Sequence, residues 1–305
     1  MPGEQLSPWK VRELMTSAID QLQKKGFDEA RLNVELLLSH SLSCKRIHLY
    51  TGFDKPLTKR EVDEFRMLLD RRLKHEPVQY IIGSTNFMGL ELKVDSRVLI
   101  PRPETETLVE QVVFGCHELD DASKINIIEI GTGSGNIAIA LAKYIKKSSI
   151  TTIDNSGAAL EVAKINITAH GVASRVTLRE IDVFEPVDQL LLRRFDVLVS
   201  NPPYVPPDEW EGLRPEVRDY EPRNATADSK DGFEFYRRLV ELAPYLLVDE
   251  GAVYVEVGFG QAPEVRRLME AGHFSGVSVT QDLQGTNRVV KGRCRAKSRN
   301  PVVSN

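Results

Sequence analysis

Three closely spaced glycines follow an apolar stretch near the middle of the chain. The segment from Ile127 to Gly135 reads Ile-Ile-Glu-Ile-Gly-Thr-Gly-Ser-Gly, and we expect it to lead from a strand into a helix. Glycine permits a tight turn and lets a ligand lie against bare backbone. The spacing is Gly-x-Gly-x-Gly, which differs from the Gly-x-Gly-x-x-Gly of the usual dinucleotide fingerprint. This loop predicts a cofactor site that offers backbone N–H groups.

Two aspartates follow the next two predicted strands. Asp154 ends the first of them, about 20 residues beyond the glycines, where such folds place the carboxylate that binds a ribose. One carboxylate can accept hydrogen bonds from both ribose hydroxyls. Asp182 follows the next strand, where it could accept from an adenine amino group. Taken alone, these residues also fit a simple turn with two helix-capping aspartates, or a nicotinamide-dependent oxidoreductase.

The string Asn201-Pro202-Pro203-Tyr204 points to chemistry at a nitrogen atom. It follows the predicted strand Phe195–Ser200, and the carboxyl end of such a strand borders the ligand crevice of an open α/β sheet. An amide nitrogen is a poor nucleophile because its lone pair is delocalised. Hydrogen bonds to the Asn201 side-chain oxygen and the Pro202 carbonyl could turn that lone pair toward an electrophilic methyl group, with Tyr204 stacked on the acceptor. The alternative is an ordinary Asn-Pro turn.

The elements that carry these residues alternate between strands and helices. Further strands are predicted at Asn126–Ile130, Ser149–Asp154, Val176–Glu180, Ala252–Val257, Val277–Asp282 and Asn287–Lys291, with helices at Asn136–Ile145, Ser156–His170, Phe233–Leu246 and Ala262–Ala271. This alternation indicates a mostly parallel sheet with helices on both faces. Since the last two strands are close in sequence, we expect one of them to run antiparallel at the sheet edge.

The residues before the sheet predict a helical bundle and a hairpin. Trp9 to Arg72 has helical periodicity, and Thr58 with Glu61 has the spacing of a capping box. A strand over 87–94 should pair with 94–100. The following Pro101-Arg-Pro-Glu-Thr-Glu106 should form a rigid loop that leads into a helix from about Glu104 to Phe114.

Composition limits the class of protein. The chain has 305 residues, 41% of them hydrophobic, and a formal net charge of −4, which disfavours a protein that coats nucleic acid. No apolar stretch approaches the roughly 20 residues of a spanning helix, and the N-terminus lacks the apolar core of a signal peptide. Three scattered cysteines suggest neither a disulfide framework nor a metal site. We expect a cytoplasmic, metal-free protein.

These motifs together resemble the HemK-like (PrmC) family of peptide chain release factor glutamine N5-methyltransferases. The resemblance runs from about Trp9 to Arg293. It is carried by the glycine loop, by Asn201–Tyr204, and by the segments Ala30-Arg-Leu-Asn-Val-Glu-Leu-Leu-Leu, Glu76-Pro-Val-Gln-Tyr-Ile, Phe87-x-Gly-Leu, Leu99-Ile-Pro-Arg-Pro-Glu-Thr-Glu, Glu221-Pro, Asp231-Gly and Asn287-Arg-Val-Val. Asn-Pro-Pro-Tyr alone is shared with DNA adenine-N6 methyltransferases, so it indicates nitrogen chemistry and leaves the acceptor open.

The resemblance implies a class I S-adenosylmethionine methyltransferase of the α/β class, with a Rossmann-like, mostly parallel seven-stranded sheet. The expected parts are a helical bundle for substrate recognition (1–76), a β-hairpin and loop linker (77–103), the methyltransferase domain (104–293) and a disordered tail (294–305). Cofactor contacts are expected from Gly131, Thr132, Gly133, Ser134, Gly135, Asp154, Asp182, Val183 and Asn201, and acceptor contacts from Asn201, Pro202, Pro203 and Tyr204.

The implied substrate is the glutamine of the Gly-Gly-Gln motif in release factors, so direct nucleic-acid binding is not expected. The alternative enzyme is a nucleic-acid adenine or guanine N-methyltransferase that flips its base into the same pocket. A third possibility is a non-catalytic binding protein that retains the fold, although the intact glycine loop and intact Asn201–Tyr204 speak against it.

Overall fold

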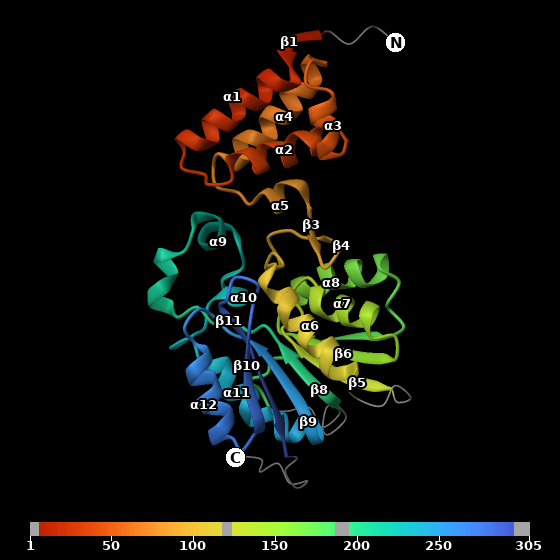
Figure 1. The fold of residues 1–305 in the computed structure, drawn as a ribbon, viewed down its shortest axis with the longest axis vertical. Coiled ribbons are helices and arrows are strands. Elements are labelled where there is room, and N and C mark those ends of the chain that lie inside the picture. Colours follow the sequence, from red (N-terminus) through yellow and green to blue (C-terminus); the bar gives the residue numbers. More distant parts are fainter. Residues whose placement is uncertain (1–5, 118–123, 187–194, 296–305) are drawn as a thin grey trace. The chain divides into compact units, whose positions relative to one another are not determined.

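The computed structural model describes residues 6–117, 124–186 and 195–295 and divides into two compact units. The helical unit comprises Met1–Ser84 together with Arg214–Tyr220. The sheet unit comprises Thr85–Leu213 and Glu221–Asn305 (Figure 1). The first boundary therefore lies beyond the expected end at residue 76. The reason is a short helix, α5 (Val78–Ile82), which buries Val78 and Ile81 against the bundle core.

The helical unit is a bundle closed by a two-stranded sheet. Its elements are β1 (Leu6–Lys10), α1 (Val11–Lys24), α2 (Ala30–Ser41), α3 (Arg46–Thr51), β2 (Pro56–Thr58), α4 (Lys59–Arg72), α5 and α9 (Pro215–Tyr220). Leu22, Leu37 and Phe65 are fully buried in its core. The predicted capping box is confirmed: Glu61 N donates to Thr58 Oγ1 over 3.2 Å, and Thr58 N donates to Glu61 Oε2 over 2.7 Å.

Helix α9 is far from the rest of this unit in sequence. Its Glu216 forms an ion pair with the buried Arg72 of α4, with 2.7 Å between Oε1 and Nη2. The Tyr220 hydroxyl donates to the Lys74 carbonyl over 2.7 Å. This packing of α9 on the bundle leaves no signal in the sequence, because no periodic pattern marks Glu216 or Tyr220 as a partner of the bundle.

The hairpin is shifted from its predicted position. Strands β3 (Ser84–Phe87) and β4 (Leu90–Lys93) form a two-stranded sheet, and residues 94–100 are not a strand. Met88 and Gly89 join the strands with φ values of 49° and 74°. Two positive φ values in succession are typical of a tight two-residue turn. The Met-Gly pair is not among the usual sequence signals for this turn, so the prediction missed it.

The sheet unit contains the predicted mostly parallel sheet. Its strands are β5 (Ile125–Ile130), β6 (Ser148–Asp154), β7 (Val176–Glu180), β8 (Phe195–Ser200), β9 (Leu247–Glu256), β10 (Ser275–Gln281) and β11 (Asn287–Cys294), in the order β10-β11-β9-β8-β5-β6-β7. Strand β11 is antiparallel to both neighbours. The prediction of an antiparallel edge strand was wrong in position, because β11 is second from the edge and β10 forms the edge.

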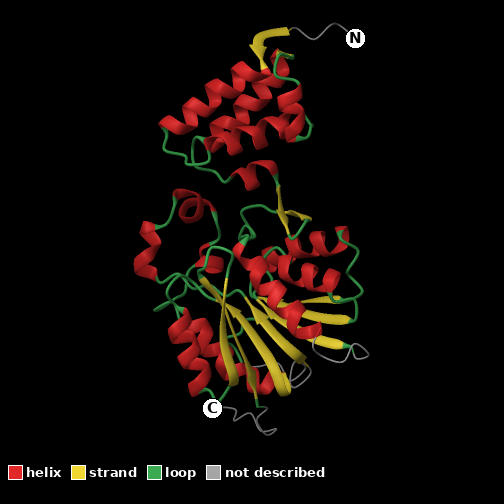
Figure 2. Ribbon diagram, in the orientation of Figure 1, coloured by secondary structure: helices red, strands yellow, loops and turns green. Residues whose placement is uncertain are grey.

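Helices cover both faces of this sheet (Figure 2). One face carries α6 (Glu104–His117), α7 (Asn136–Tyr144) and α8 (Gly157–Ala169), and the other carries α11 (Glu234–Leu246) and α12 (Ala262–Ala271). Ile127 packs on the first face and Ile128 on the second, as expected for a strand buried on both sides. The α/β class is confirmed. Two further short elements of the sheet unit lie within the described residues, η2 (Pro207–Gly212) and α10 (Arg223–Thr226).

Cys294 is buried in β11, so the expected tail begins too early at residue 294; residues 296–305 lie outside the described part. Among the residues that the structure describes, no helix has the length and apolar character needed to cross a bilayer.

Candidate active site

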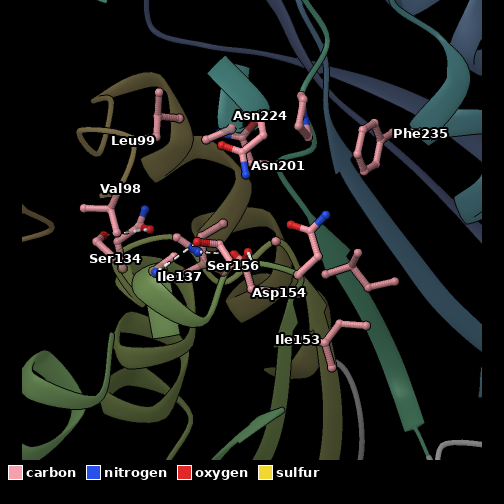
Figure 3. A pocket seen from close by; sticks show the side chains of 18 of the residues that line it. Val98, Leu99, Ser134, Ile137, Ile153, Asp154, Ser156, Asn201, Asn224 and Phe235 are labelled. Atoms are coloured by element: carbon pink, nitrogen blue, oxygen red, sulfur yellow. Dashed lines mark hydrogen bonds between the residues drawn. The ribbon is translucent and has the colours of Figure 1, made fainter. Parts of the chain in front are cut away.

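The carboxyl ends of three neighbouring parallel strands bring the predicted site residues together. Ile130 of β5 pairs with Ile153 of β6 on one side and with Ser200 of β8 on the other. The residues that follow each strand therefore share one edge of the sheet. A cavity opens there, and its lining includes Gly131, Asp154 and Asn201 (Figure 3). This edge is where open α/β sheets bind their ligands.

The glycine loop has the backbone geometry that its sequence predicts. Gly131, Gly133 and Gly135 have φ values of 89°, 51° and 83°, in the region that other residues rarely adopt. A Cβ atom added to Gly133 would have no atom within 4 Å, so open space lies above this backbone. A Cβ atom on Gly135 would lie 3.4 Å from Ala163 Cβ, so this glycine allows close packing of α7 on α8.

Asp154 supports the loop and keeps capacity for a ligand. Its Oδ2 accepts from Gly133 N over 3.0 Å, and its Oδ1 accepts from Ser156 N over 2.9 Å. Burial raises the pKa of this carboxyl group, and these two backbone bonds lower it. A carboxylate oxygen can accept more than one hydrogen bond, so both oxygens can also accept from a ribose. The capping role and the cofactor role are thus compatible.

An apolar slot lies beside Asp154. Ile153, Ile181, Val183 and Phe235 line the same cavity, and so does Asp182. Asp182 Oδ1 accepts from Phe184 N over 2.9 Å, which holds the carboxylate in an Asx turn. A planar aromatic ring such as adenine fits between apolar side chains with a carboxylate at its polar edge.

Of the four residues of the Asn-Pro-Pro-Tyr motif, Asn201 and Pro203 line the cavity, whereas Pro202 and Tyr204 do not. The Asn201 side-chain nitrogen donates to Thr105 Oγ1 over 3.1 Å. Pro202 is buried, and the Tyr204 carbonyl accepts from Gln261 Nε2 over 3.0 Å. Burial raises the pKa of the Tyr204 phenol to about 12. In this structure the Tyr204 ring packs against the core formed with α11 and α12, so its stacking on an acceptor stays a prediction.

The Pro101–Glu106 segment forms part of the cavity wall. Pro101, Arg102 and Thr105 line the cavity. Arg102 Nη2 donates to both carboxylate oxygens of the buried Glu221, over 2.7 and 2.8 Å. Burial raises the pKa of Glu221 and the Arg102 charge lowers it. Glu106 Oε1 accepts from Met88 N over 2.6 Å, so this glutamate supports the hairpin turn.

Two protein families match parts of this chain. The PrmC N-terminal domain matches residues 13–83, and the methyltransferase small domain matches residues 111–211. A release factor glutamine methyltransferase of Geobacter sulfurreducens is 42% identical over 93% of this chain and 97% of its own length. The one from Chlorobaculum tepidum is 42% identical over 94% and 98%. The chain belongs to the release factor glutamine methyltransferase family.

A solved structure agrees with this fold. The hMettl16 catalytic domain, solved in complex with the MAT2A 3'UTR hairpin 1, has a TM-score of 0.53 at 14% identity, covering 76% of this chain and 79% of that one. At this identity the likeness shows the fold alone. The methyl donor of this class I methyltransferase is S-adenosylmethionine. The open space above Gly133, the acceptor capacity of Asp154 and the apolar slot beside it fit an amino-acid carboxylate, a ribose and an adenine.

The predicted site residues of this methyltransferase fall into two groups. Eight line the cavity: Gly131, Gly133, Ser134, Asp154, Asp182, Val183, Asn201 and Pro203. Thr132, Gly135, Pro202 and Tyr204 are not among its lining residues; for example, the buried Thr132 Oγ1 is 2.7 Å from Thr152 Oγ1. Sequence reasoning missed Asn224 and Phe235, which have no motif of their own, and it gave Thr105 no individual role.

Proposed function

We propose that this methyltransferase transfers a methyl group to the side-chain amide nitrogen (N5) of the glutamine in the Gly-Gly-Gln motif of peptide chain release factors. The observation that carries the proposal is the position of Asn201. Its side chain lines the same cavity as the glycine loop, and a Cβ atom on Gly131 would lie 3.6 Å from the Asn201 carbonyl oxygen. An amide acceptor bound at Asn201 is therefore directly beside the cofactor site.

The reaction needs orientation more than it needs an acid or a base. S-adenosylmethionine supplies a methyl carbon bonded to a positively charged sulfur, and the C–S electron pair returns to sulfur as the nitrogen lone pair forms the new C–N bond. The nitrogen then loses one of its two protons to water. Asn201 Oδ1 and the Pro202 carbonyl accept the N–H hydrogens and turn the lone pair out of conjugation. Fixing the acceptor in this geometry lowers the barrier.

The substrate assignment is supported by the relatives. The Geobacter and Chlorobaculum proteins are named as release factor glutamine methyltransferases, and this chain aligns with nearly their whole length. A glutamine carboxamide is planar, and neighbouring glycines let its loop enter a narrow cavity at little steric cost. We assign recognition of the body of the factor to the helical unit, and we place the protein in the cytoplasm, where translation occurs.

Mass spectrometry of a release factor after incubation with the full-length protein and S-adenosylmethionine tests the proposal. We expect one added methyl group on the Gly-Gly-Gln glutamine. A factor in which this glutamine is replaced by glutamate is the matched control, and it should stay unmodified because it lacks the nucleophilic nitrogen. Methyl transfer to adenine in DNA or RNA, with none to the release factor, would overturn the assignment in favour of a nucleic-acid methyltransferase.

A further inference from the structure

A side-chain amide can present either its oxygen or its nitrogen to a ligand, and the two ends have nearly the same shape. The hydrogen bonds around the amide decide which end faces the ligand. In this protein the Asn201 nitrogen Nδ2 donates to Thr105 Oγ1 over 3.1 Å, and both residues line the cavity. This bond leaves Asn201 Oδ1 as the end that can accept from an incoming N–H group.

Thr105 by itself does not impose this orientation, because a hydroxyl group can both donate and accept. Its second partner is Glu256, the last residue of β9, which is 1% exposed. Hydrogen bonding by the Thr105 side chain lowers the pKa of the Glu256 carboxyl group, and of the two carboxyl oxygens it is Oε2, not Oε1, that is buried without a partner in the described part of the chain. An ionised carboxylate only accepts, so the Thr105 hydroxyl hydrogen must point to Glu256. The oxygen lone pairs of Thr105 then remain for the Asn201 N–H.

The burial of Glu256 indicates more than a structural role. Its Oε2 has no hydrogen-bond partner within residues 6–117, 124–186 and 195–295, and Thr105 is also only 1% exposed. A buried carboxylate with an unpaired oxygen destabilises a fold, so a hydrophobic or amide residue of similar size would serve packing better. The carboxylate is suited to one task here, which is to fix the direction of the Thr105 hydroxyl.

We propose that Thr105 and Glu256 are positioning residues that hold the Asn201 amide with Oδ1 toward the acceptor nitrogen. This inference rests on the proposed methylation of an amide nitrogen. If the Asn201 amide rotated by half a turn, its own N–H would face the N–H of the acceptor. Two donors would then oppose each other, and the lone pair of the acceptor nitrogen would lose its alignment with the methyl group. Neither positioning residue needs to touch the acceptor.

Because Glu256 can be protonated, the effect of these two positioning residues on the rate of methyl transfer should depend on pH. Burial raises the pKa of Glu256 to about 7, with the Thr105 hydrogen bond and the Arg288 and Arg102 charges lowering it and the Glu104 charge raising it. Tyr204 and Tyr236 also face this group. Once Glu256 is protonated it no longer enforces the direction of the Thr105 hydroxyl. The rate of methyl transfer should therefore rise with pH through about 7.

The experiment compares variants of the full-length protein with a release factor as substrate. Thr105→Val keeps the shape of the side chain and removes the hydroxyl; we expect kcat to fall about 10- to 100-fold while the dissociation constant for S-adenosylmethionine stays within about threefold. Thr105→Ser restores the hydroxyl and should recover most of the rate. Glu256→Gln should lower kcat and remove the rise near pH 7. Thr168→Val, which loses an exposed hydroxyl on α8, is the matched control.

A second readout does not depend on the acceptor. In nuclear magnetic resonance spectra, the Asn201 side-chain NH2 signals, identified by their loss in Asn201→Ala, should exchange with solvent faster in Thr105→Val than in the parent protein. If the parent protein methylates no release factor, the proposed function fails. The exchange measurement still tests whether Thr105 holds the Asn201 amide in place. The proposed positioning role of Thr105 and Glu256 is refuted if Thr105→Val keeps the parent kcat, or if the Asn201 NH2 exchange is the same in both proteins.

Discussion

The buried carboxyl group of Glu129 allows a quantitative test of how burial next to the glycine loop raises a pKa and changes the stability of the protein. It lies in the interior strand β5, two residues before Gly131, and its side chain is fully buried. Neither carboxylate oxygen has a partner of full hydrogen-bond geometry in the part of the chain that the structure describes, although the Thr152 side chain and the Ala138 N–H lie near enough to lower its pKa. Burial raises the pKa of Glu129 from 4.5 to about 8, with a further contribution from the Asp154 charge. Glu129→Gln should therefore change how stability depends on pH.

The sign and size follow from proton linkage. Below pH 4.5 Glu129 is protonated in both the folded and the unfolded chain, and its contribution to stability is fully present. As the pH rises toward about 8, only the unfolded chain loses the proton, so stability falls by about 1.4 kcal/mol per pH unit. The total loss approaches about 5 kcal/mol. A glutamine at this position does not titrate, so the stability of Glu129→Gln does not fall with pH for this reason.

Thermal unfolding of the full-length protein measures this difference. Between about pH 5 and about pH 8, the Tm of Glu129→Gln relative to the parent should rise by about 8–16 °C, since 1 kcal/mol corresponds to about 2–4 °C for a domain of this size. Glu110→Gln, at an exposed position on α6, is the control and should follow the parent at every pH. A Tm difference between Glu129→Gln and the parent that is the same at both pH values would refute the reasoning.

Three further predictions concern the site itself. Asn201→Ala removes the acceptor that orients the nitrogen, so single-turnover methyl transfer should fall about 100-fold or more, and near-normal turnover would contradict the mechanism. Gly133→Val places a side chain in the open space of the loop at a φ of 51°, so calorimetry should detect no S-adenosylmethionine binding; the parent should bind it and bind no NADH. Asp154→Asn sets an NH2 group against a backbone N–H and should weaken cofactor binding about 10- to 100-fold, whereas unchanged affinity would exclude a ribose contact.

Much of this protein is determined by local sequence. Val176–Glu180 and Phe195–Ser200 were predicted as strands with the observed bounds, and Ala262–Ala271 as a helix, because buried parallel strands and amphipathic helices leave clear periodic patterns. The tight turn of the glycine loop was predicted correctly because its backbone conformation requires glycine, whereas its contacts with the cofactor stay a prediction. The position of Asp154 and Asn201 at strand ends then followed from the rule that parallel strands end at one edge.

Other features depend on contacts between residues that are distant in sequence. Thr105 and Asn201 are 96 positions apart, and Arg72 and Glu216 are 144 apart. Asn224 and Phe235 belong to no sequence motif, and they line the cavity only because the fold brings the segments that carry them next to it. Whether Tyr204 lines the cavity or packs against the core likewise depends on its neighbours. The type and spacing of residues determine which bonds a side chain can make. Only the folded chain determines which partner lies close enough to form one.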